Sequence, residues 1–205
     1  MSGPWTTGHT AGRLAALATV SLLAASPAPA QDAVGGPILH TAFLGGYSLW
    51  LGQSGDLESR NWAYGGTLRY FGGASGGTRL GFGANWLRNN VSINGRYRTG
   101  GRTFTDELRL TRLGGDLYYG LPPNRRGNVP YFLAGGGQLT AEGETAAGAT
   151  AELEEGFWEV GMGIINGGSN YTAFALELKY IGKLENEVRS DDGMIQLSMS
   201  VGYNW

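Results

Sequence analysis

The sequence predicts an all-β fold, an eight-stranded antiparallel up-and-down β-barrel that crosses a membrane. Three observations support this prediction. Apolar and polar residues alternate over about eight segments after Gln31, and compact turns alternate with longer, more polar loops between these segments. The last segment, 193–205, keeps its alternation up to the final residue, Trp205. An even number of segments, each long enough to cross a bilayer at a tilt, is typical of membrane barrels.

Residues 1–30 have the layout of a secretory signal peptide. An arginine precedes an apolar run (14–25), and the small residues that follow favour cleavage between Ala30 and Gln31. The run is too short to cross a bilayer as a helix. An amphipathic helix of a cytosolic protein is the alternative, but the segment has no polar face. We therefore expect export and a mature chain of one barrel domain, 31–205.

The composition excludes several classes of protein. Cysteine is absent, which excludes a disulfide framework, a thiolate metal site and a thiol nucleophile. Charged residues make up 16% of the chain, too few to cover the outside of a soluble barrel. The formal net charge of −2 gives no reason to expect nucleic acid as a partner.

The breaks in alternation define the order of the segments. The eight strand-like segments are 38–51, 58–71, 78–93, 103–121, 129–141, 151–166, 170–185 and 193–205. The compact turns are 72–77, 121–128 and 166–170, and the longer or more polar loops are 52–60, 89–101, 142–155 and 185–193. Short turns on one rim and long loops on the other are typical of periplasmic and extracellular ends, so both chain termini are expected on the periplasmic side.

The two faces of the segments differ in character. In 170–185, Phe174, Leu176 and Leu178 alternate with positions that include Glu177 and Lys179. A charged side chain costs about 2–4 kcal/mol on the lipid face at the midplane, so the charged face must line the lumen. Buried opposite charges should pair, which predicts a lumen charge network of Arg69, Arg112, Asp116, Glu159, Glu177 and Lys179. Such a network either plugs the barrel or lines an ion or proton path.

Aromatic residues mark the two expected membrane interfaces, where their amphipathic rings favour the headgroup level. The turn-side set is Tyr70, Tyr119, Tyr131, Tyr171, Tyr203 and Trp205, and the loop-side set is Trp62, Trp86 and Trp158.

Two segments fit the alternation less well. Leu108 and Leu110 have the opposite parity to Leu113 and Leu117, which predicts either a bulge near Thr111 or a segment that rises above the lipid. In the first segment, Trp50 shares the parity of His40 rather than that of Phe43. The register of these two segments therefore stays open.

With its signal peptide, its eight alternating segments and its terminal VGYNW, the mature chain resembles the small eight-stranded outer-membrane barrels, the OmpA/OmpX-like group of the Gram-negative envelope. The resemblance implies a monomer without cofactor, whose last strand is recognised by the barrel-assembly machinery. That insertion signal would comprise Met199, Val201, Tyr203 and Trp205. The last strand must also pair with the first, because lipid does not tolerate an open sheet edge.

Catalysis is the main alternative from another class, because some small barrels of this kind modify lipid A with a histidine and a serine. His40 is the only histidine of the mature chain, and no nearby serine is evident in the sequence, which favours a rim histidine. No cluster has recognisable metal-ligand spacing. We therefore expect no catalytic residue, no metal and no cofactor.

The second loop offers a candidate surface contact. Arg96, Arg98 and Arg102 can chelate phosphate, which predicts contact with lipopolysaccharide, although the same side chains can pair with neighbouring acidic loops. The sequence thus favours an outer-membrane barrel with a plugged lumen and a structural, surface-interaction or adhesin-like role. A narrow ion or small-solute channel is the alternative, and a lipid A-modifying enzyme is less favoured.

Overall fold

The computed structural model describes residues 37–51, 60–73, 77–93, 96–99, 102–166, 172–183 and 193–204. The predicted signal peptide, Tyr171 and Trp205 lie outside these ranges, as do the side chains of Trp50 and Arg98. In the described part of the chain, no helix has the length and apolar character needed to span a membrane.

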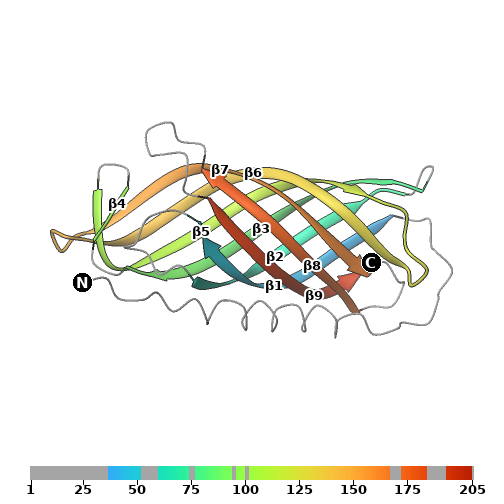
Figure 1. Cartoon of the computed structure of the whole chain (residues 1–205), viewed down its shortest axis with the longest axis horizontal. Coiled ribbons are helices and arrows are strands. Elements are labelled where there is room, and N and C mark those ends of the chain that lie inside the picture. The colour runs from blue at the N-terminus through green and yellow to red at the C-terminus, as the bar shows by residue number, and fades with distance from the viewer. Residues whose placement is uncertain are drawn as a thin grey trace, which may run out of the picture. The chain divides into compact units, whose positions relative to one another are not determined.

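The described residues form nine strands, eight of which close into an antiparallel barrel (Figure 1). The eight barrel strands pair in chain order, so that β3 pairs with β5, and β9 closes the barrel by pairing with β1. The short β4 pairs with the beginning of β5 at the loop end of the barrel. The fold class expected from the alternation is confirmed. The strands are β1 (Ile38–Trp50), β2 (Arg60–Phe71), β3 (Arg79–Ser92), β4 (Tyr97–Thr99), β5 (Arg102–Gly120), β6 (Asn128–Thr145), β7 (Thr150–Asn166), β8 (Thr172–Lys183) and β9 (Met194–Asn204).

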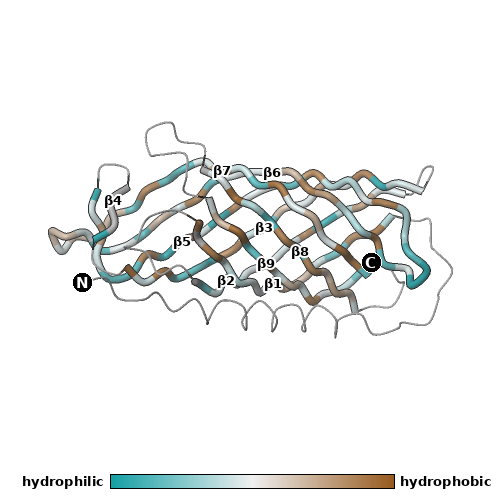
Figure 2. The backbone as a smooth tube through the Cα atoms, viewed as in Figure 1, coloured by the Kyte–Doolittle hydropathy of each residue, from teal (hydrophilic) through white to brown (hydrophobic). Residues whose placement is uncertain are grey.

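Hydrophobic and hydrophilic residues alternate along the barrel strands in Figure 2, and large apolar side chains are exposed on every barrel strand. Phe43 is 85% exposed and Trp62 is 75% exposed. Apolar exposure of this kind around the whole circumference would be unfavourable for a soluble barrel. Outward apolar side chains from the eight strands include Phe43, Trp62, Leu80, Leu117, Phe132, Met162, Phe174 and Met199. Such a surface is typical of a barrel that faces hydrocarbon.

One aromatic residue assigned to the turn-side interface lies elsewhere. Tyr131 is 1% exposed and points into the barrel, because β6 turns Pro130 and Phe132 outward. Its neighbours on the lumen face are Val129 and Leu133. The prediction of Tyr131 as an interface aromatic was therefore wrong.

The predicted bulge near Thr111 is also absent from β5. Pairing with β6 is regular from Leu108 onward, and the register shifts between Thr105 and Leu108 instead. Leu108 and Leu110 are buried on the lumen face, so their parity reflects an apolar interior at this height. Asp106, within the irregularity, has a positive φ of 66°, consistent with the local distortion.

The predicted loop 142–155 is mostly a hairpin. β6 continues to Thr145 and β7 begins at Thr150, so only residues 146–149 form the connection. Gly148 takes the left-handed φ of 75° that closes this turn. Sequence alternation missed the hairpin because glutamates and small residues occupy both faces of strands that extend beyond the apolar belt.

The interior has three layers along the barrel axis. An apolar cluster lies toward the loop end, and it includes Val91, Phe104, Leu108, Leu139, Phe157 and Met194. A second apolar cluster lies toward the turn end, and it includes Ile38, Phe71, Tyr118, Val129, Tyr131 and Ile165. In the turn-end cluster the rings of Phe71, Tyr118 and Tyr131 contact one another, with centroids 5.2–5.5 Å apart. Buried polar and charged residues lie between the two clusters, and a small third apolar cluster on β1, β2 and β3 consists of Leu44, Ala63 and Leu87.

Glycines on neighbouring strands make room for the large side chains of this interior. Gly163 pairs with Tyr131 across β6 and β7, and a Cβ at Gly163 would lie 2.6 Å from the Tyr131 hydroxyl. Two atoms cannot approach that closely without displacement. The Tyr131 ring can therefore lie against Gly163 of β7 only because residue 163 lacks a side chain. The high glycine content of the chain therefore serves the packing of a narrow lumen.

We predict that Gly163→Ala destabilises the folded barrel by about 1–3 kcal/mol, because the added methyl displaces Tyr131 from a filled interior. Gly45→Ala is the matched control, since a Cβ at Gly45 would meet nothing within 4 Å. Urea unfolding of the refolded protein measures both changes. A Gly163 variant as stable as the Gly45 variant would contradict the packing argument.

Candidate functional site

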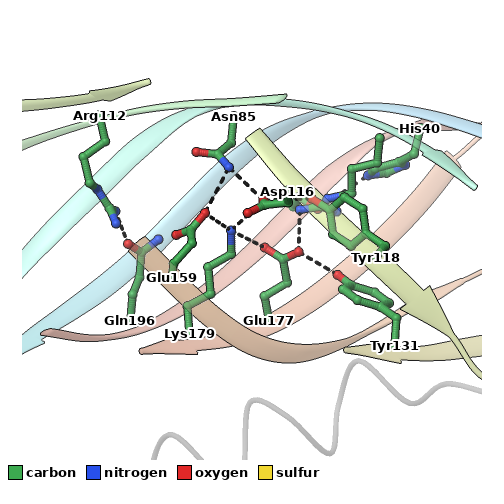
Figure 3. A network of polar contacts seen from close by, with 12 residues as sticks. His40, Asn85, Arg112, Asp116, Tyr118, Tyr131, Glu159, Glu177, Lys179 and Gln196 are labelled. Atoms are coloured by element: carbon green, nitrogen blue, oxygen red, sulfur yellow. Dashed lines mark hydrogen bonds and ion pairs between the residues drawn. The ribbon is translucent and has the colours of Figure 1, made fainter. Parts of the chain in front are cut away.

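The six residues predicted to form a lumen charge network lie inside the barrel, on β2, β5, β7 and β8 (Figure 3). Each is at most 3% exposed. Three are cations and three are anions, so the set is neutral when all are ionised. Burial without such balance would be costly, because an isolated charge in a low-dielectric interior loses its hydration without compensation.

Lys179 lies among three carboxylates. Its Nζ is 3.2 Å from Asp116 Oδ2, 3.1 Å from Glu159 Oε1 and 3.9 Å from Glu177 Oε2. Asp116 and Glu159 lie on β5 and β7, strands separated by β6, so the ammonium group links strands that do not pair directly.

Arg69 occupies the part of the network nearest the turn end. Its Nη2 is 3.1 Å from Glu177 Oε1, and its Nη1 donates to Ser200 Oγ at 3.2 Å. The hydroxyl of Tyr131 donates to the same Glu177 oxygen at 2.7 Å. Glu177 therefore receives one hydrogen bond and one ion pair from the turn side and faces Lys179 on the other side, which ties the charged layer to the turn-end cluster.

Neutral side chains donate to one oxygen of each of the two remaining carboxylates. Asn85 Nδ2 donates to Asp116 Oδ2 at 2.8 Å and to Glu159 Oε1 at 3.2 Å. The Tyr118 hydroxyl donates to Asp116 Oδ2 at 3.0 Å. Such donors hold carboxylates of like charge close together, because each hydrogen bond offsets part of their repulsion.

Arg112 lies apart from Asp116, Glu177 and Lys179 in Figure 3, and on β5 it is nearer to the loop end than Asp116 is. Its Nη2 donates to Gln196 Oε1. Its Nε and Nη1 have no hydrogen-bond partner among the described residues. The structure therefore brings five of the six predicted residues into direct contact. The sixth, Arg112, is bonded instead to the side-chain amide of Gln196.

The position of His40 differs from the rim location expected for it. His40 is fully buried, directly between Arg69 on β2 and Asn204 on β9. Its Nδ1 lies 3.0 Å from Asn204 Oδ1, and its Nε2 lies 3.5 Å from Ser200 Oγ. The sequence could not reveal Ser200 as a neighbour, because barrel closure joins residues 160 positions apart.

The other predicted site residues fall on the surface. Arg96 and Arg102 are exposed at the loop end, and Arg102 Nη1 donates to the carbonyl oxygen of Glu152 at 2.8 Å. Met199, Val201 and Tyr203 of the expected insertion signal all face outward on β9, at 44%, 40% and 38% exposure. Among the described residues, no group of three His, Asp or Glu side chains has an arrangement suited to a metal ion.

Several members of the buried layer were not identified from the sequence. Asn85, Gln196 and Ser200 are polar residues at lumen positions of β3 and β9, so strand parity alone could have signalled them. Tyr131 gave no such signal, because a tyrosine suits both the interface and the lumen. Its inward direction follows from the register of β6, which Pro130 and Phe132 set by facing outward.

We predict that Arg69→Met lowers the free energy of unfolding by about 3–5 kcal/mol, because Glu177 then loses its closest charged partner in a buried site. The double variant Arg69→Met with Glu177→Leu should be less destabilised than the single variant, since it restores neutrality. Urea titration of the refolded protein gives the coupling.

The exposed pair Arg109–Glu142 is the control for this cycle, at 3.3 Å and with side chains 47% and 46% exposed. The same substitutions there should change stability by less than about 1 kcal/mol. Equal effects at the buried and exposed pairs would refute the importance of the lumen network.

The fold is that of small eight-stranded outer-membrane barrels. Ail, the attachment invasion locus protein of Yersinia pestis, is similar with a TM-score of 0.53 and 10% identity, over 83% of this chain and 99% of that one. Neisserial surface protein A is similar with a TM-score of 0.57 and 11% identity, over 82% and 97%. A second structure of Ail, in complex with the heparin analogue sucrose octasulfate, aligns with a TM-score of 0.51 and 12% identity.

No protein-family model and no curated protein sequence matches the chain. At these identities the solved structures show a common fold. The region from Ile38 to Asn204 is thus a closed eight-stranded antiparallel barrel of the outer-membrane type.

Proposed function

We propose that this protein is an exported outer-membrane barrel with a closed lumen, which acts through its surface rather than by transport or catalysis. The three-layered interior is the observation that carries this proposal. Two apolar clusters flank a neutral network of buried charges, so side chains occupy the axis from the loop end to the turn end. An eight-stranded barrel is just wide enough to be filled in this way.

The location is supported by the outward apolar belt and by the barrel fold. A charged side chain on the lipid face is costly, and the charges of the central strand segments point inward here. The two named relatives in fold are an attachment and invasion protein and a surface protein. We extend a surface role of this kind to the present chain as part of the proposal.

The loop end provides the surface for such contacts. β7 pairs with β8 only from Phe157 onward, whereas Thr150 to Gly156 pair with β6 alone among the described residues. The β6–β7 hairpin therefore extends beyond the β7–β8 ladder. Together with the first part of β5, it presents exposed charged side chains, which include Arg102, Arg109, Glu142 and Glu152.

The burial of His40 supports the absence of catalysis. His40 and Ser200 are 0% and 2% exposed, and Ser200 Oγ also accepts a hydrogen bond from the Arg69 guanidinium. A serine nucleophile needs access to its substrate and a base that takes its proton. The contacts of this pair instead serve to join β1, β2 and β9 at the barrel seam.

We predict that the refolded wild-type protein gives no steady current in a planar lipid bilayer, because its lumen is filled. Arg112→Ala should produce brief openings, since it removes a large side chain next to the loop-end cluster. Arg109→Ala, on the outside, is the control and should behave as wild type. A steady, ion-selective current through the unmutated protein would establish the narrow channel instead.

We predict that the folded protein binds vesicles that contain lipopolysaccharide, and that Arg96→Ala with Arg102→Ala weakens this binding about tenfold, through lost charge-assisted contacts with phosphate. Flotation of vesicles with and without lipopolysaccharide measures the effect, which should decrease with salt. Arg109→Ala is the control, because Arg109 is engaged by Glu142. Unchanged flotation of the double variant would exclude these arginines as the contact.

A further inference from the structure

An apolar groove lies on the outward face of the barrel, at its turn end. Its volume is about 310 Å³. Outward-facing side chains of β6, β7, β8 and β9 line it, together with Leu121 at the end of β5. The principal lining residues are Pro130, Phe132, Met162, Ile164, Leu176 and Leu178.

Strand register gives the groove its form. Phe132, Met162 and Leu178 pair in one row across β6, β7 and β8, and these side chains are 50%, 54% and 45% exposed. Pro130, Ile164 and Leu176 pair in the adjacent row nearer the turns, and these side chains are less exposed than those of the first row. Because the row nearer the turns protrudes less than the Phe132 row, the surface is depressed there across β6, β7 and β8.

The groove ends at the turn between β5 and β6. Leu121 lines the groove, and its backbone N–H donates to the carbonyl oxygen of Pro130 at 2.8 Å. The turn that follows presents Arg125 and Arg126 on the surface. Asn124 Oδ1 accepts hydrogen bonds from the backbone N–H of Arg126 at 2.9 Å and of Asn128 at 3.1 Å. These bonds give a defined form to the turn that carries the two arginines and that follows Leu121 of the groove.

The charged side chains of the three turn sequences are all cationic. The turn sequences 72–77, 121–128 and 166–170 contain no aspartate or glutamate, whereas exposed carboxylates gather at the loop end. An arginine beside an apolar groove on a lipid-facing wall complements a molecule with a phosphate at one end and hydrocarbon at the other.

We propose that this groove binds one anionic glycerophospholipid. Its acyl chain lies along Ile164 and Leu176, and its headgroup phosphate binds the guanidinium groups of the 121–128 turn, with Arg125 as the principal contact. The inference rests on the proposed membrane location, and it assigns to the turn-side leaflet a lipid contact distinct from the lipopolysaccharide contact at the loops.

Native mass spectrometry of the full mature chain, refolded in detergent micelles, tests the proposal. Dioleoyl-phosphatidylglycerol and dioleoyl-phosphatidylcholine are titrated in parallel. We expect one phosphatidylglycerol adduct to be retained about tenfold better than phosphatidylcholine, and Arg125→Ala to remove that preference. Ile164→Trp, which fills the groove, should reduce the retention of both lipids.

Two control variants separate this site from general effects. Arg109→Ala removes a positive charge at the loop end, and Leu117→Trp enlarges an outward side chain that is 71% exposed and outside the groove. Both should retain phosphatidylglycerol as wild type does. Migration on unboiled gels verifies that every variant is folded.

Equal retention of the two lipids, or a preference that survives Arg125→Ala, would overturn the proposal. A dimer that Ile164→Trp dissociates would also overturn it, because the groove would then seat a second copy of the chain. The measurement depends on the groove and not on where the cell places the barrel. Cell fractionation tests the outer-membrane location separately, so the failure of either proposal can be recognised.

Discussion

A barrel in a bilayer can leave no backbone N–H or C=O group unpaired toward lipid, and here the pairing of β1 with β9 meets that requirement. The ladder runs from His40 opposite Asn204 to Trp50 opposite Met194. Side-chain contacts within the barrel reinforce this seam, because His40 contacts Asn204 and Arg69 bonds Ser200. The alternation of the last strand up to the end of the chain follows from this constraint.

Closure also decides what the interior can contain. Eight strands leave a lumen too narrow for large side chains to lie opposite one another on every strand. The strand register resolves this by placing glycine beside charge. Across β2, β3, β5, β6 and β7, neighbouring positions read Arg69, Gly83, Asp116, Gly135 and Glu159. Each charged side chain can therefore lie over the glycine of the adjacent strand, on the lumen side, and reach its partners in the centre of the barrel.

The sequence predicted the barrel and its inward charges because lipid imposes a strict two-residue period on both faces. Glu177 and Lys179 could be assigned from parity alone. Beyond the apolar belt this period disappears, and the β6–β7 hairpin was therefore interpreted as a loop. Contacts such as that of His40 with Ser200 depend on the pairing of strands far apart in the chain, and a single sequence does not reveal the register of that pairing. Tyr131 escaped assignment because its amphipathic ring suits two environments.

The distribution of the lumen charges along the chain has a consequence for the two halves of the molecule. Of the six residues, Arg69, Arg112 and Asp116 precede the 121–128 turn and sum to +1, whereas Glu159, Glu177 and Lys179 follow it and sum to −1. Neither half can bury its charges neutrally without the other. The barrel thus consists of two electrostatically complementary halves, each with a net charge among these six residues that the other half neutralises.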